Sequence, residues 1–184
     1  MPSLRLITAP VAEPVSVETA KLFLRVDGTL EDTLITSLIH GARETGEELS
    51  RRAFITQTLE MTFDAWPRDK VFTLWRPPLQ SVVSVKYLDQ DGAEYSWTDF
   101  FADTQNEPGQ VFFYSFPTEA LRKSGAIAVR YVAGYGGDEN AVPQRIKGAL
   151  QALIAYRYEN REGVMIPDDI RDAFIAERAV WFPT

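Results

Sequence analysis

The chain contains no cysteine and a single histidine, His40, among its 184 residues. Without cysteine it can form no disulfide bond, no thiolate-bound zinc or iron–sulfur site and no thiol nucleophile. One histidine cannot build a multi-histidine metal site either. We therefore expect a protein without a metal or any other cofactor.

The chain also has no excess of basic residues. It contains 19 Lys and Arg and 26 Asp and Glu, which gives a formal net charge of −7. Proteins that hold nucleic acid through a broad surface use Lys and Arg to neutralise phosphates. The charge argues against such a surface, although it is compatible with DNA passing by. No segment resembles a secretory signal or a membrane span of roughly 20 apolar residues. We expect a soluble cytoplasmic protein with no membrane partner.

The hydrophobic content of 45% is that of a globular chain, and its first apolar segments have helical spacing. Ser16 is a good N-cap and predicts a short helix that ends near Val26. Thr29 with Asp32 resembles a capping box and predicts a long helix to about Arg52. Apolar residues of this helix recur every four positions, at Leu30, Leu34, Leu38 and Ala42, and further apolar residues lie beside them: Ile35, Ile39 and Leu49.

The period then changes to that of strands. Leu59, Met61 and Phe63 alternate with polar neighbours, as a half-buried strand requires. Further strands are predicted over residues 71–74, 82–88, 94–97, 110–114 and 126–132. Asp91-Gly92 has the composition of a hairpin turn. Residues 110–114 and 126–132 alternate in phase, which leaves direct pairing between these two segments open.

Helical spacing returns at Pro143, which favours the first position of a second long helix that runs to about Asn160. Small residues follow one side of this helix, where another helix could approach closely: Gly148, Ala152 and Ala155. Asp168 and Asp169 favour the start of a last short helix, because carboxylates suit its positive N-terminal end. We expect that helix to end in Trp181-Phe182.

The order of helix, helix, several strands, helix and helix predicts an α+β fold rather than alternating βαβ units. We expect residues 1–52 to form an N-terminal arm and helices, and residues 53–141 to form an inserted antiparallel β region. Residues 142–184 are expected to complete a helical body with residues 15–52, so that two long helices are flanked by short N- and C-terminal ones. Residues 53–141 hold twelve acidic and seven basic side chains, so most of the negative charge belongs to the β region.

Three groups of residues superficially resemble catalytic or ligand-binding motifs. Asp89, Asp91 and Gly92 resemble part of a calcium loop, but the later ligand positions are missing and a hairpin turn fits better. Residues 134–137 are rich in glycine but lack the Lys-Ser or Lys-Thr pair of a phosphate loop. His40 has no serine partner in a nucleophile motif. We expect no enzyme.

Aromatic residues are abundant, and most of them are expected in the core. A rival hypothesis is a small-molecule or glycan-binding β module on a helical scaffold, suggested by six aromatic residues of the predicted strands: Trp75, Tyr87, Tyr95, Trp97, Phe112 and Tyr114. Trp181 and Phe182 are different, because chain ends are seldom core unless a partner docks on them. Aromatic side chains are enriched in protein interfaces.

Five blocks of the chain form a recognisable series. They are residues 14–32, with Pro14-Val15-Ser16 and Leu24-Arg25-Val26-Asp27; 51–58 (RRAFITQT); 76–88 (RPPLQSVVSVKYL); 130–136 (RYVAGYG); and 143–162, ending in YENRE. In this order the blocks resemble the head–tail connector (adaptor) proteins of tailed bacteriophages and gene transfer agents, in particular longer members with a β insertion. Five blocks in register are hard to obtain by chance.

The resemblance implies a structural protein that assembles as a ring, commonly of twelve copies, beneath the portal. Its implied partners are the portal protein, neighbouring copies of itself and the next tail or stopper protein, while DNA passes through without sequence-specific binding. Such a protein, from a phage, prophage or gene transfer agent, would assemble in the bacterial cytoplasm and end in the neck of the particle. The residues expected to contact the portal or a neighbour are Trp181, Phe182, Tyr158 and Arg161.

Overall fold

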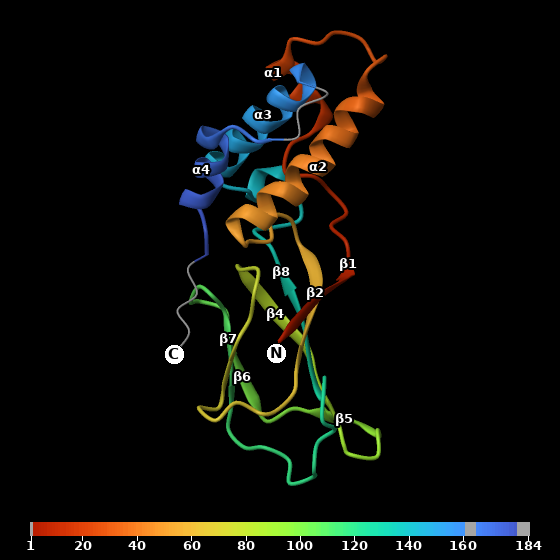
Figure 1. The fold of residues 1–184 in the computed structure, drawn as a ribbon, viewed down its shortest axis with the longest axis vertical. Coiled ribbons are helices and arrows are strands. Elements are labelled where there is room, and N and C mark those ends of the chain that lie inside the picture. Colours follow the sequence, from red (N-terminus) through yellow and green to blue (C-terminus); the bar gives the residue numbers. More distant parts are fainter. Residues whose placement is uncertain (1, 161–164, 180–184) are drawn as a thin grey trace. The chain divides into compact units, whose positions relative to one another are not determined.

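The structure, a computed structural model, describes residues 2–160 and 165–179. The chain forms two units, each with its own elements (Figure 1). The β unit comprises residues 2–10 and 56–134, and the helical unit comprises residues 11–55 and the described residues from 135 onwards. The segment before residue 11, expected to be part of an N-terminal arm, is therefore grouped with the strands.

The helical unit contains four α-helices and one short 3₁₀ helix among the described residues. They are α1 (Val17–Leu24), α2 (Asp32–Ser50), η1 (Glu139–Ala141), α3 (Gln144–Glu159) and α4 (Asp168–Ala176). The predicted cap of the first helix is confirmed, because the Ser16 side chain accepts a hydrogen bond from the Thr19 amide at 3.2 Å. Helix α4 ends at Ala176, earlier than predicted, and Trp181-Phe182 lies outside the described residues.

The start of α2 differs from the prediction, whereas most of its predicted apolar residues face the core. The helix begins at Asp32, and its N-cap residue makes no side-chain capping bond, so the capping box is wrong. Leu30 is fully exposed in the preceding loop instead of heading the apolar stripe. The side chains of Ile35, Ile39 and Ala42 are buried, as predicted, and Leu38 and Leu49 are partly buried against the same core.

The core of the helical unit closes around Gly46 of α2. A Cβ atom at this position would lie 2.7 Å from Cε1 of Phe174 on α4 and 2.8 Å from Cε2 of Phe54. Both phenylalanines are fully buried. The close approach predicted at Gly148 is absent within the described structure, because nothing lies within 4 Å of a Cβ built there. The packing of α2 against Phe54 and Phe174 thus requires glycine at position 46.

A buried carboxylate fixes the end of α2 to the segment that follows it. Glu47 Oε1 accepts a hydrogen bond of 2.8 Å from the Phe54 amide. Glu47 Oε2 lies 3.5 Å from Nη1 of Arg43, and Arg43 Nε donates to Glu13 Oε2 at 2.9 Å. Buried charges are tolerated when they are paired and hydrogen-bonded. Through Arg43 and Glu47, α2 thus holds both the segment before α1, at Glu13, and the segment after α2, at Phe54.

The β unit contains two antiparallel sheets. The five-stranded sheet has the order β1-β2-β8-β4-β5, and the three-stranded sheet has the order β3-β7-β6. The strands are β1 (Ser3–Thr8), β2 (Gln57–Phe63), β3 (Val71–Thr73), β4 (Leu79–Leu88), β5 (Glu94–Trp97), β6 (Phe100–Asp103), β7 (Gln110–Phe113) and β8 (Ile127–Ala133). The α+β class with antiparallel sheets is therefore confirmed.

Most strand predictions are correct, but one pairing is wrong. Leu59, Met61 and Phe63 on β2 are buried, as their alternation predicts. The turn at Asp91-Gly92 joins β4 to β5, and Asp89 Oδ1 accepts hydrogen bonds from the amides two and four residues later, as in a hairpin turn. Strands β7 and β8 belong to different sheets and do not pair. Each finds a partner elsewhere, because in-phase alternation does not specify register.

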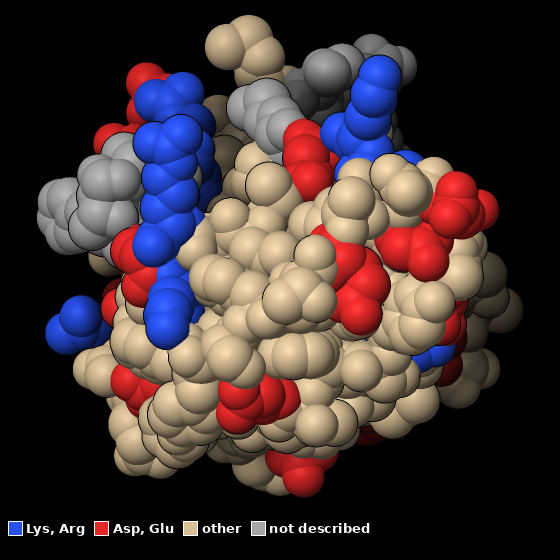
Figure 2. Space-filling view, turned by 90° about the horizontal axis from the view of Figure 1, so that it is seen from below, with Lys and Arg blue, Asp and Glu red and all other residues tan. Residues whose placement is uncertain are grey.

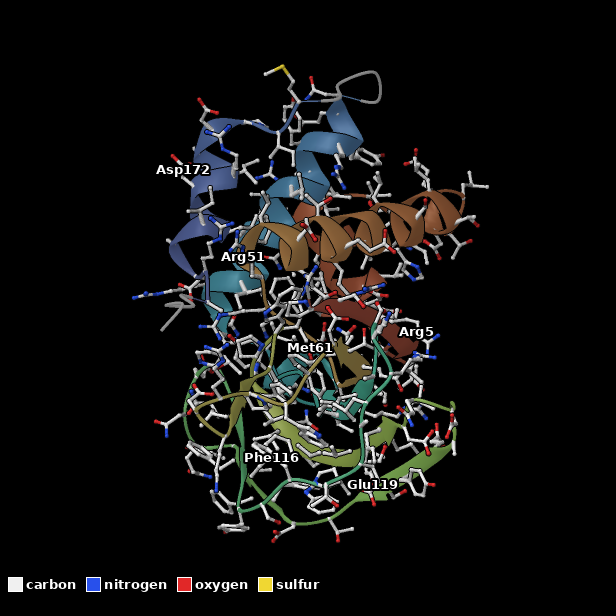
Figure 3. All side chains as sticks on the ribbon, turned by 60° about the horizontal axis from the view of Figure 1, so that its bottom comes forward. Arg5, Arg51, Met61, Phe116, Glu119 and Asp172 are labelled. Carbon is white, nitrogen blue, oxygen red and sulfur yellow. The ribbon has the colours of Figure 1, made fainter. Side chains whose placement is uncertain are left out.

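Aromatic side chains fill the core of the β unit. Phe63 on β2 stacks on Phe72 of β3 with ring centroids 3.7 Å apart, which joins the two sheets. Trp66 stacks on Phe116 at 5.2 Å. Phe116 and Glu119 come from the segment between β7 and β8 (Figure 3), and the Tyr87 hydroxyl donates to Glu119 Oε2 at 3.4 Å. This long connection is thus held on the aromatic core.

Two glycines provide a matched test of this packing. Gly46→Ala should lower the free energy of unfolding by about 1–3 kcal/mol, because its Cβ must displace Phe54 and Phe174. Gly148→Ala should raise it by up to about 1 kcal/mol, since alanine stabilises a helix interior and meets no neighbour. Chemical denaturation followed by circular dichroism measures both. Equal effects of the two changes would contradict the described core.

Candidate assembly surfaces

Three large apolar side chains of the helical unit are exposed close together in the chain. Leu22 is 82% exposed, Phe23 52% and Leu30 100%. We call these three residues the α1 ridge. Scattered exposed apolar residues are normal, but a group of them is typical of an interaction site. The ridge is therefore the first candidate surface.

The loop that carries Leu30 is tied to α1. The Lys21 ammonium donates to the carbonyl oxygen of Gly28 and, at 2.7 Å, to Asp32 Oδ1. The left-handed residue Arg25 ends α1, and its amide and that of Val26 bond back to carbonyls of the last turn. A ridge held in this way loses little conformational freedom when it binds.

The second candidate surface is the outer face of the three-stranded sheet. Phe101 on β6 pairs with Phe112 on β7, and Phe112 pairs in turn with Val71 on β3. Side chains alternate along a strand, so these residues share the face opposite the buried Phe72 and Phe113. Phe101 is 54% exposed, and Tyr114, two residues after Phe112, is 64% exposed. An apolar aromatic face thus borders solvent.

A charged cluster lies on the five-stranded sheet. Glu60 on β2 accepts hydrogen bonds from Arg5 on β1 at 2.7 Å and from Arg130 on β8 at 2.7 Å (Figure 3 labels Arg5). Partial burial alone would raise the pKa of Glu60, but the hydrogen bonds and positive charges of the two arginines outweigh it, so the pKa lies below its usual value. The cluster joins three strands and leaves both arginines partly exposed.

Of the residues predicted from the sequence to contact partners, only Tyr158 is described. It is partly buried against the helical core, and its hydroxyl donates to Glu31 Oε2 at 2.5 Å. These contacts fix Tyr158 within the helical unit, and its contact with a partner stays a prediction. Arg161, Trp181 and Phe182 lie outside the described residues.

His40 on α2 lies beside a carboxylate. Its Nε2 atom lies 3.3 Å from Glu13 Oε1, and the described residues include no serine hydroxyl bonded to it. In the part of the chain that the structure describes, no three His, Asp or Glu residues gather as a metal site. No described helix is long and apolar enough to cross a membrane.

The aromatic residues behind the glycan-binding hypothesis differ in exposure: Tyr87 is buried, and Trp75, Trp97 and Phe112 are half-buried. Of the six, only Tyr95 and Tyr114 are exposed. Tyr87 is buried and packs against Tyr95 and Trp97, with ring centroids 5.3 and 6.3 Å away. Packing thus involves Tyr87, Tyr95 and Trp97, whereas Phe112 and Tyr114 lie on the outer face of the three-stranded sheet.

The α1 ridge was missed by the sequence prediction, although a signal for it exists. Leu22, Phe23 and Leu24 are consecutive, and each residue of a helix turns by about 100° from the last. Three consecutive apolar side chains therefore spread over more than half of the helix and cannot all face one core. With Ala20 buried and Leu24 packed on the core, the other two must point outwards.

Solved structures with this fold come from gene transfer agent (GTA) particles. A chain in the neck of an empty GTA particle computed with C6 symmetry has a TM-score of 0.83 and 19% identity, covering 98% of this chain and 97% of that chain. A chain in the virion of a native GTA particle has a TM-score of 0.81 and 21% identity, with the same coverage. In the neck of a native GTA particle computed with C12 symmetry the values are 0.75 and 19%. No protein-family model and no curated protein matches the chain.

The tie between Lys21 and the ridge loop can be tested by hydrogen exchange. Lys21→Met removes both bonds of the ammonium and should speed exchange of the two hydrogen-bonded loop amides, those of Val26 and Asp32, by about tenfold, because the loop loses its anchor. Lys86→Met, which breaks the exposed pair with Glu94, is the matched control and should leave this loop unchanged. Unchanged exchange in Lys21→Met would show that the loop is held by other contacts.

The Glu60 cluster predicts a pH-dependent contribution to stability. Since its folded pKa is lowered, Glu60 stabilises fully above its usual pKa of 4.5 and loses this effect as pH falls through the lower folded value. Glu60→Gln should therefore destabilise by about 1 kcal/mol at pH 7 and by less near pH 3. Urea titrations at both pH values measure the difference. A difference in the free energy of unfolding between the wild type and Glu60→Gln that is larger at pH 3 than at pH 7 would be incompatible with the two arginine contacts.

Proposed function

We propose that this chain is a structural head–tail connector, which assembles as a ring under the portal, joins the capsid to the tail and forms part of the DNA conduit. The observation that carries the proposal is the shared fold with chains of GTA necks, over 98% of this chain and 97% of theirs. The role is structural and not enzymatic. The expected number of copies in the ring is twelve.

Several features of the two units support a role in assembly. The α1 ridge and the outer aromatic face of the three-stranded sheet both present apolar side chains to solvent. An assembly component needs such surfaces, because each copy must bury part of itself against a neighbour. Two of the structural neighbours belong to necks computed with C6 and C12 symmetry, as ring assembly requires.

The charge of the chain supports passage of DNA rather than its binding. The net charge is −7, and the acidic excess is greatest in the segment that contains the strands. Figure 2 shows acidic side chains dispersed among uncharged residues over much of the face that it views, with Lys and Arg gathered at its left and upper right. A conduit of this character repels phosphates and leaves DNA free to slide, without sequence-specific contacts.

The proposed partners of the ring are the portal protein on one side and the next tail or stopper protein on the other. Trp181, Phe182 and Arg161 are the proposed contact residues, and Tyr158 would act by holding the end of α3 to Glu31. The chain would assemble in the bacterial cytoplasm and finish in the neck of the particle.

Electron microscopy of labelled particles tests the proposal. A short peptide tag between Asp91 and Gly92 occupies an exposed hairpin turn, where an insertion is tolerated. Particles from cells that make the tagged chain are decorated with an antibody fragment against the tag and averaged. The fragments should form a ring at the head–tail junction, and nowhere else on the particle.

Particles carrying the untagged chain provide the control for non-specific decoration. Decoration of the capsid surface or of the tail tip would overturn the proposal, as would particles that lack the chain altogether.

A further inference from the structure

The α1 ridge is surrounded by negative charge. Residues 17–32 contain four carboxylates and two cations, a net charge of −2: Glu18, Asp27, Glu31 and Asp32 against Lys21 and Arg25. Asp32 is paired with Lys21, and Glu31 accepts from Tyr158, whereas Glu18 and Asp27 are exposed. The apolar side chains of the ridge thus have an acidic rim, which favours a basic partner surface.

The first turns of α3 have the opposite character. Helix α3 carries Arg145, Lys147 and Arg157 against Glu159, a net charge of +2, and its first turn contains no acidic residue. Cations at this end are unfavourable for the helix itself, because its N-terminus already has a partial positive charge. The Arg145 side chain is 85% exposed, and its ion pair with Glu177 is long, at 3.7 Å.

Gly148 lies one turn further along α3 and has no function in the packing of the helical unit. It is exposed, and a Cβ built on it meets nothing within 4 Å. Glycine inside a helix is unfavourable compared with alanine. When a residue lowers the stability of its own helix and no packing contact compensates, a functional role of that position is a common explanation. Because glycine has no side chain, another molecule can approach the helix backbone closely at this position.

We infer that the α1 ridge of one copy docks on the first turns of α3 in a second copy, with the ridge over Gly148 and its acidic rim facing Arg145 and Lys147. This contact rests on the ring proposed above and specifies its subunit interface. Beyond Gly148, the half-buried Ala152 and Ala155 continue the smooth surface for the apolar side chains.

A second copy is favoured over an unrelated protein because the two surfaces complement each other in charge, −2 against +2, on one chain. They belong to different helices, so the contact is head-to-tail. A head-to-tail contact of this kind continues from copy to copy until a ring closes. The surface area of the ridge alone is smaller than the area that a stable interface buries. The ridge therefore acts together with the other contacts of a ring.

The natural absence of cysteine makes this contact testable by cross-linking without background. Thr29→Cys lies beside the ridge, and Gln144→Cys lies on the exposed first turn of α3. The double variant is treated with a short bismaleimide, both in purified particles and as concentrated full-length protein. A ladder of dimers, trimers and larger species is expected on a denaturing gel.

The two single-cysteine variants are the matched controls and should give no ladder. Cross-linking of the double variant that stops at dimers overturns the head-to-tail contact, as does a strong dimer from Thr29→Cys alone. If the tagged chain is found in the neck but the particles give no ladder, the contact is wrong and the proposed function stands. If the chain is absent from particles, the concentrated protein decides: a ladder supports the contact and its absence overturns it.

Two further changes, made in the double-cysteine background, address the same contact. Gly148→Trp should leave the chain folded, because the site is open, and should abolish the ladder, whereas Gly148→Ala should weaken it least. Replacing Glu18 and Asp27 by Lys should reduce the ladder by about threefold or more, and replacing Arg145 and Lys147 by Glu in the same chain should restore it. A ladder that survives Gly148→Trp, or charge reversals without mutual rescue, would overturn the inference.

Discussion

Phe54 is the residue on which the helical unit depends. Its ring fills the space that Gly46 leaves on α2, and its amide donates to the buried Glu47 carboxylate at 2.8 Å. Its carbonyl oxygen accepts from the Tyr135 amide at 3.2 Å, at the point where the chain returns from the β unit. Phe174 packs into the same place from α4. Segments distant in sequence are thus held together by one buried phenylalanine, and the surfaces of α1 and α3 are fixed relative to that core.

The sequence was sufficient to predict those elements whose pattern is local. The strand β2 follows from strict alternation, and the cap at Ser16 and the end of α3 near Asn160 follow from the chemistry of single residues. The partners of β7 and β8, which lie in different sheets, could not be predicted, because alternation fixes which face of a strand is buried but not which strand lies beside it. The capping box failed for another reason: Lys21, eleven positions earlier, takes the Asp32 carboxylate.

The candidate surfaces were less predictable than the fold. Residues at the C-terminal end, Trp181 and Phe182, attract attention in the sequence because aromatic ends suggest docking. The α1 ridge is harder to recognise, because Leu22 and Phe23 have the composition of an ordinary helix core. Only the small number of apolar side chains that a helix of eight residues can bury indicates that they are exposed. Gly148 was predicted as a place of close approach, but among the described residues the close approach within the unit occurs at Gly46. A contact of Gly148 with a second copy is our inference.

We propose a non-catalytic ring component whose subunits meet through α1 and α3. A density map of the assembled particle neck, resolved well enough to trace helices, tests this most directly. The account predicts a ring of copies of this fold in which Leu22, Phe23 and Leu30 of each copy lie against Gly148 of the next. A neck that lacks this fold, or a ring in which the ridge faces solvent, would contradict it.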